Sequence, residues 1–221
     1  MQIKRTNFAH GRFRGRSLVD TQNLVRTLRK EYLLVFLALI FLCGEIFGSV
    51  FSKTADFSLL GKLDFIFYSD FTRRASQSLG SIFVASLAST FLFVLCCFLC
   101  GLSAWGLFFI PFIPFFRGFG VGVTAGYLYA VYGFEGVLFH AVIILPGAFI
   151  CVLSILYAAK EGIQISKRIA SQCFFAQKSG GDLKIHAYLS RYGMIIVLAV
   201  LSAVLDIIMT ACFSGAFSFL E

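Results

Sequence analysis

The sequence predicts an all-α fold, a polytopic integral membrane bundle of about five transmembrane helices with a cytoplasmic N-terminus. Of its 221 residues, 59% are hydrophobic and 14% are charged, whereas about a quarter of a soluble domain is charged. Several apolar runs exceed about 18 residues, the length at which a helix can cross a bilayer. Most of the 19 Lys and Arg stand at the ends of these runs, where they set the orientation of a membrane protein.

A basic segment, 1–31, precedes a single transmembrane domain over 32–221. The first apolar run is too long for the core of a signal peptide, and no small-residue cleavage site follows it, so we expect an uncleaved signal-anchor. The apolar runs predict five spans, at about 32–51, 82–102, 104–132, 137–158 and 194–219.

The distribution of basic residues predicts the topology. With the N-terminus inside, the segments 1–31 and 159–193 are both cytoplasmic and hold 14 basic residues, against four in the outer loop 52–81 and the single Arg117 inside a span. If 104–132 were a re-entrant hairpin instead, the basic segment 159–193 would lie outside, which the positive-inside rule disfavours.

Three connecting stretches separate the spans. The outer loop 52–81 mixes apolar and charged residues, so it is either a docking surface for a partner or a simple connector. A tight turn is expected at 133–136. Residues 161–177 can either continue the fourth helix or lie along the membrane as an amphipathic helix.

Glycines recur at four-residue spacing in two spans. Gly44 and Gly48 form such a pair in the first span, and Gly118, Gly122 and Gly126 form a ladder in the third. Residues four apart share one helix face, and small residues there let another helix approach to backbone contact. These glycines are therefore predicted to pack helices together.

Three charged residues fall inside predicted spans. Glu45, Arg117 and Asp206 all lie roughly 18–20 Å from the inner ends of their spans at about 1.5 Å per residue. Because an isolated charge is costly in hydrocarbon, an intramembrane charge cluster is geometrically possible. Such a cluster would either lock the helices together or relay a proton or solute.

The three prolines all occur inside predicted spans. Pro111 and Pro114 remove backbone donors near the start of the third span, and Pro146 does so in the fourth. Broken helices of this kind line solute sites in transporters, but they are also ordinary kinks in helical bundles.

No catalytic residue, metal site or cofactor is predicted. The three cysteines of Cys96-Cys97-x-x-Cys100 have no second Cys or His pair in a loop, so we interpret them as small apolar residues. His140 is expected to be a structural hydrogen-bonding group, paired with Glu135 or a neighbour. Neither a nucleophile motif nor a phosphate-binding loop is present. The basic residues predict contact with anionic membrane lipids and no nucleic-acid partner.

The run Phe116-Arg-Gly-Phe-Gly-Val-Gly122 with Gly126, then Tyr132-Gly-Phe-Glu-Gly-Val-Leu-Phe139, then Ile144-Leu-Pro146, resembles the stage II sporulation protein M family. The order of these motifs, the length and the number of spans match over nearly the whole chain. Near the Leu-Pro pair, where the family often has a polar residue such as Asn, this chain has Gly147-Ala148.

The resemblance implies a role in endospore-forming bacteria. Proteins of that family act with a lytic transglycosylase and an amidase–endopeptidase, two peptidoglycan hydrolases that remodel the wall at the sporulation septum during engulfment of the forespore. The family protein is the membrane scaffold of that complex and has no hydrolase activity of its own.

The leading hypothesis is therefore a non-enzymatic, multi-pass scaffold of the cytoplasmic membrane at the septum, with a homo-oligomer as a further possibility. The alternative is a small transporter or permease subunit with an intramembrane cluster of Arg117, Glu45 and Asp206.

Overall fold

The computed structural model describes residues 31–54, 79–175 and 185–213, and all of its regular elements are helices. Their bounds are α2 (Tyr32–Thr54), α5 (Leu79–Gly101), α6 (Gly106–Phe109), α7 (Phe112–Phe139), the π-helix η1 (His140–Ile144), α8 (Leu145–Phe175) and α9 (Ile185–Phe213). The predicted all-helical class is confirmed. The basic segment 1–30, most of the outer loop and the turn before the last helix lie outside the described residues.

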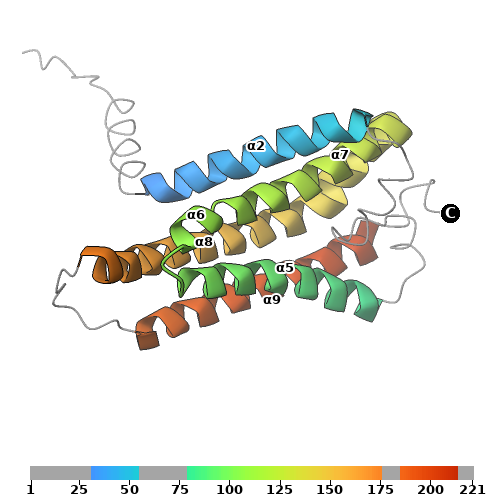
Figure 1. The fold of residues 1–221 in the computed structure, drawn as a ribbon. Helices are drawn as coiled ribbons and strands as arrows, with labels where there is room; N and C mark the ends of the chain where they lie inside the picture. The colour runs from blue at the N-terminus through green and yellow to red at the C-terminus, as the bar shows by residue number, and fades with distance from the viewer. Residues whose placement is uncertain (1–30, 55–78, 176–184, 214–221) are drawn as a thin grey trace, which may run out of the picture.

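Contacts between the helices fix their directions. Gly118 and Gly126 of α7 meet Phe41 and Ser49 of α2, so these two helices run parallel. Helix α9 runs antiparallel to α5, because Ser86 hydrogen-bonds Asp206 whereas Phe98 stacks on Tyr188. Helix α8 runs antiparallel to α9 and parallel to α5. The long helices therefore alternate in direction along the chain (Figure 1).

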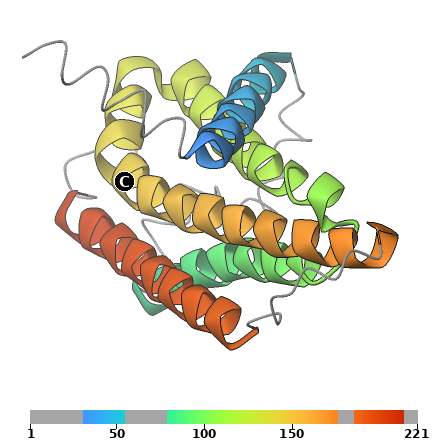
Figure 2. The same ribbon diagram turned by 90° about the vertical axis from the view of Figure 1, so that its left-hand side faces the viewer.

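Helix α8 is the central helix of the bundle. It lies between the pair α2–α7 and the pair α5–α9 (Figure 2). The main core cluster gathers around it and includes Leu37 of α2, Cys97 of α5 and Ile155 of α8, all of them almost completely buried. A smaller cluster, formed by Leu128, Phe139, Ile143 and Ile144, fills the space under the turn between α7 and α8.

Within the part of the chain that the structure describes, four helical stretches are long and apolar enough to cross a membrane: 32–54, 83–101, 106–173 and 188–213. The third is 68 residues long and reverses direction, so it runs along the bundle twice. The four stretches thus trace about five passes, in line with the sequence. Their outward side chains are mostly large and apolar, as expected of surfaces that face lipid.

The reversal between the third and fourth passes occurs at Gly133. Its φ of 54° is a left-handed conformation that a side chain disfavours. Just beyond it, a Cβ atom built on Gly136 would lie 2.3 Å from the carbonyl oxygen of Leu128, so the returning backbone packs directly on α7. The glycines of the predicted 133–136 turn are those that this geometry requires.

One predicted boundary differs from the structure. The third pass was expected to begin at 104, but α7 begins at Phe112, and residues 106–109 form the separate short helix α6. Of the two alternatives left open for residues 161–177, the structure shows the first for the part of this stretch that it describes. Residues 161–175 continue α8, because apolar and small residues such as Gly162 and Ile163 keep one face of the helix buried.

Candidate functional site

The glycines of α2 and α7 meet along one interface, where the two helices interlock. A Cβ atom built on any of these glycines would lie 2.0–2.9 Å from a backbone oxygen of the other helix. Real Cβ atoms do not approach so closely, so only glycine permits this spacing. The five residues are Gly44, Gly48, Gly118, Gly122 and Gly126. At this distance the two backbones gain dispersion and weak Cα–H···O contacts.

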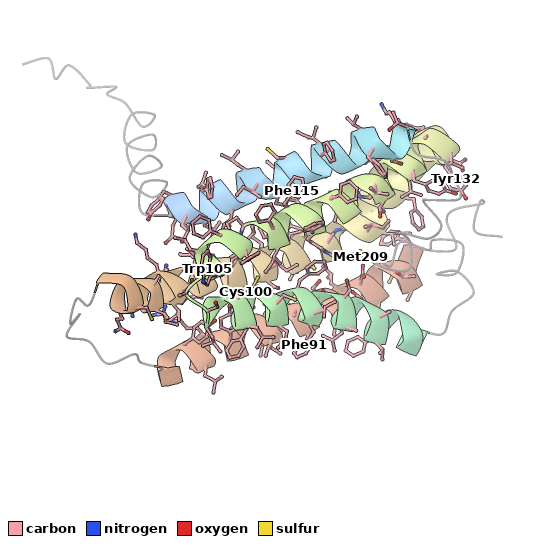
Figure 3. All side chains as sticks on the ribbon, in the orientation of Figure 1. Phe91, Cys100, Trp105, Phe115, Tyr132 and Met209 are labelled. Carbon is pink, nitrogen blue, oxygen red and sulfur yellow. The ribbon has the colours of Figure 1, made fainter. Side chains whose placement is uncertain are left out.

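Phenylalanines cover one edge of this interface. The ring of Phe119 lies 6.1 Å from that of Phe47 and 5.6 Å from that of Phe51, and Phe115 lies 6.4 Å from Phe47. Figure 3 shows Phe115 between the two helices. The glycines bring the backbones together and the rings fill the margin, so α2 and α7 form one tightly packed unit.

Arg117 points away from this interface, toward α5. Successive residues of a helix are about 100° apart, so the side chain beside Gly118 cannot face α2 as well. Its Nη1 donates a hydrogen bond to Ser89 Oγ at 3.2 Å. The guanidinium carbon lies 5.6 Å from the centre of the Phe93 ring. Its Nε atom is buried without an acceptor, and Arg117 forms no ion pair among the described residues.

Asp206 is buried on α9 and also contacts α5. Its carboxylate accepts a hydrogen bond from Ser86 Oγ at 3.0 Å. On its other side lies Gly147 of α8, where an added Cβ would come within 2.6 Å of the carboxylate oxygen Oδ1. Gly147 has no side chain, which leaves room for the carboxylate.

No ion pair joins the three intramembrane charges among the described residues. Arg117 and Asp206 each bond a serine of α5, and these serines, Ser86 and Ser89, are one helical turn apart. Glu45, half-buried on α2, packs its backbone against Gly122 and forms no ion pair among the described residues. Nothing in the sequence singled out the two serines, because the span that holds them carries no charge.

Two of the three prolines lie at the start of helix α7, and the third lies next to a π-bulge. Pro111 is the residue before α7, and Pro114 lies in its first turn, where backbone N–H groups have no intrahelical acceptor anyway. Pro146 follows the π-helix η1. Its missing N–H and its ring disturb the preceding turn of an α-helix, and a π-bulge is a common response to such disruption.

His140, the first residue of η1, is buried and pairs with Tyr129. Its Nδ1 lies 3.0 Å from the Tyr129 hydroxyl, and the two rings meet edge to face. Its Nε2 is buried without a hydrogen-bond partner. The expected hydrogen-bonding role holds, but the partner is Tyr129 of the preceding helix and not Glu135.

The described cysteines are free thiols in different environments. Cys97 is buried in the main core and Cys151 lies against Thr90, while Cys96 faces outward. Among the described residues, no three His, Cys, Asp or Glu side chains are close enough to share a metal ion.

The fold and these contacts define a class of protein, a multi-pass helical membrane protein in which a glycine-packed helix pair adjoins charged side chains that bond serines of a neighbouring helix. A model of the stage II sporulation protein M family matches residues 37–218. The chain belongs to that family, which makes it a sporulation-related membrane protein. Neither the curated proteins nor the solved structures contain a match.

Proposed function

We propose that the protein is a non-enzymatic membrane scaffold that holds peptidoglycan hydrolases at the sporulation septum during engulfment. The partners expected from the family are a lytic transglycosylase and an amidase–endopeptidase. Family membership supports the sporulation role. The scaffold role and the partners are what the resemblance implies, and the packing of the bundle is consistent with them.

The observation that carries this proposal is the interlocked pair α2–α7. Helix α2 contacts α7 along most of its length and the other helices much less. It ends at Thr54, at the same end of the bundle where α5 begins at Leu79. The pair therefore gives the intervening outer segment a fixed base, as a scaffold requires if it presents that segment to enzymes in the wall.

The polar groups inside the bundle are consistent with a structural role. Arg117 and Asp206 bond two serines of α5 that are one helical turn apart, and His140 pairs with the Tyr129 hydroxyl, so each of these groups already bonds a hydroxyl of the protein. Catalysis by general acid and base would instead need such groups to converge on one reacting atom.

The proposal is tested by purifying the tagged protein in detergent from starved, septum-forming cells and identifying co-purifying proteins by mass spectrometry. We expect peptidoglycan hydrolases with the wild type, and their loss when residues 55–78 are replaced by a neutral linker of equal length. The matched control replaces residues 178–182 by a neutral linker of the same length as that stretch. Equal recovery of hydrolases from both variants would remove the outer segment from the proposal.

One observation favours the alternative, a transporter or permease subunit. Arg117 is a cation inside the bundle with a buried Nε that has no acceptor, and intramembrane charges often mark solute paths. Co-purification of an ATPase or a solute-binding protein, together with constant expression in growing cells, would support this alternative against the scaffold.

A further inference from the structure

One end of the bundle carries the signs of a membrane interface. Glu31 pairs with Lys160, and Glu161 pairs with Arg191 at 2.7 Å, so two ion pairs lie at one level across α2, α8 and α9. Exposed Tyr32 lies at the same level, and the ammonium of Lys160 lies 6.0 Å from the centre of the Tyr157 ring. Tyr and Trp gather where hydrocarbon meets headgroups, and the sequence predicts this end to be cytoplasmic.

Helix α6 lies at this level with its aromatic residues facing outward. Trp105, Phe108 and Phe109 are 60–67% exposed, and the first two rings lie 6.4 Å apart. Figure 3 shows Trp105 at this end of the bundle. The inner side of α6 is fixed, because Gly106 packs on the Cys100 carbonyl and Ile110 is completely buried. The three rings are thus held outward at the depth of the interfacial layer.

Helix α8 extends beyond this level. Its end reaches further out than the ends of α2, α5 and α9 (Figure 1). Ser166 Oγ donates a hydrogen bond to the Ser103 carbonyl at 2.7 Å, which ties this extension to the turn before α6. Lys167 and Arg168 follow directly and are exposed. They stand about 10 Å further along the helix than Lys160, and the headgroup layer is about 5–8 Å deep. Their long side chains therefore reach it.

We propose that this α6–α8 corner, formed by Trp105, Phe108, Phe109, Lys167 and Arg168, binds the headgroup of an anionic lipid. The aromatic rings lie among the upper acyl chains, and the two basic side chains bind the phosphate. Among the described residues neither Lys167 nor Arg168 has a carboxylate partner, so both charges are available. A net negative headgroup complements them, whereas a zwitterionic headgroup does not. This inference does not depend on the scaffold function.

Trp105 makes the test direct, because it is the only tryptophan of the chain. The full-length protein is reconstituted into phosphatidylcholine vesicles that contain either brominated phosphatidylglycerol or brominated phosphatidylcholine at equal fraction. Bromine on the acyl chain quenches nearby tryptophan fluorescence. A basic residue near an anionic surface contributes about fivefold to attraction, so we expect severalfold stronger quenching of Trp105 by the brominated phosphatidylglycerol.

Variants assign this preference to residues. In Lys167→Gln/Arg168→Gln the preference for phosphatidylglycerol should fall to about one, while quenching by both lipids persists because the aromatic rings remain in the interface. The charge-keeping variant Lys167→Arg/Arg168→Lys should retain the preference. The matched control Lys53→Gln removes an exposed basic residue at the opposite end of the bundle and should leave the preference unchanged.

Two results would overturn the proposal. Equal quenching of wild-type Trp105 by the two lipids would show that the α6–α8 corner has no preference for an anionic headgroup and only places aromatic rings at the interface. An equal loss of preference in Lys53→Gln would mean that the whole basic chain attracts anionic lipid. If the double glutamine variant does not fold, raised salt applied to the wild type provides the second measurement, since screening should bring the preference toward one.

Discussion

Gly122 of α7 lies directly against Glu45 of α2, so that a Cβ added to Gly122 would come within 2.0 Å of the Glu45 carbonyl oxygen. No movement of a flexible side chain can relieve this overlap, because the obstacle is backbone. Helices α2 and α7 would have to separate, and the other glycine contacts of the interface would then loosen with them.

Replacing Gly122 by leucine should therefore destabilise the bundle. Overpacking in a close interface costs about 1–3 kcal/mol or more, and we expect a clear drop in the thermal unfolding temperature of the purified protein in detergent. The control is Gly193→Leu on α9, where an added Cβ meets nothing within 4 Å. Membrane insertion should survive in both variants, since leucine favours the bilayer. Equal unfolding temperatures for the two variants would contradict the packing role of Gly122.

Loss of this interface should also affect assembly. In Gly122→Leu/Gly126→Leu we expect correct insertion but much reduced recovery of hydrolases in the affinity purification described above. Normal recovery from this double variant would show that the partners do not depend on the α2–α7 pair.

The sequence predicted those features of the bundle that follow from the spacing of residues along the chain. Four-residue glycine repeats indicated faces for close packing, and apolar length indicated spans. It did not indicate which faces meet, because the register between Phe41 and Gly118 depends on where α7 begins. Depth made a cluster of the three charges possible but could not show which groups they bond. Arg117 and Asp206 do lie at neighbouring depths, since Ser89 and Ser86 are one helical turn apart, but each of them bonds a serine of α5.

Gly133 and Gly193 offer a matched pair of substitutions. An added Cβ meets nothing within 4 Å at either position, but only Gly133 has a positive φ, of 54°. Gly133→Ala should destabilise the protein by about 1–2 kcal/mol, because a side chain disfavours that conformation. Gly193→Ala lies within helix α9 and should stabilise it by about 0.5–1 kcal/mol. Thermal unfolding in detergent measures both effects, and a stabilising Gly133→Ala would refute the backbone argument.

Arg117 should contribute little to the stability of the isolated protein. A central arginine costs about 2.5–3.5 kcal/mol on insertion scales. Its compensation among the described residues is one bond to Ser89 and the contact with Phe93, together worth about 1–3 kcal/mol. We therefore expect Arg117→Met to unfold at the same temperature as the wild type or slightly higher. A marked drop would show that the arginine is a structural lock.

Asp206 should behave in the opposite way, because its carboxylate fills a space shaped for it. Asp206→Asn keeps an acceptor for Ser86 and should cost little. Asp206→Leu leaves the half-buried Ser86 hydroxyl without this acceptor and places branched carbons against Gly147, where the Asp206 carboxylate already lies within 2.6 Å of an ideal Cβ position. Loss of a hydrogen bond costs about 0.5–1.5 kcal/mol and overpacking costs about 1–3 kcal/mol, so the unfolding temperature should fall clearly. In a Ser86→Ala background the penalty of Asp206→Leu should shrink, since the hydroxyl is already absent. An unchanged penalty there would mean that Asp206 acts through other contacts than Ser86.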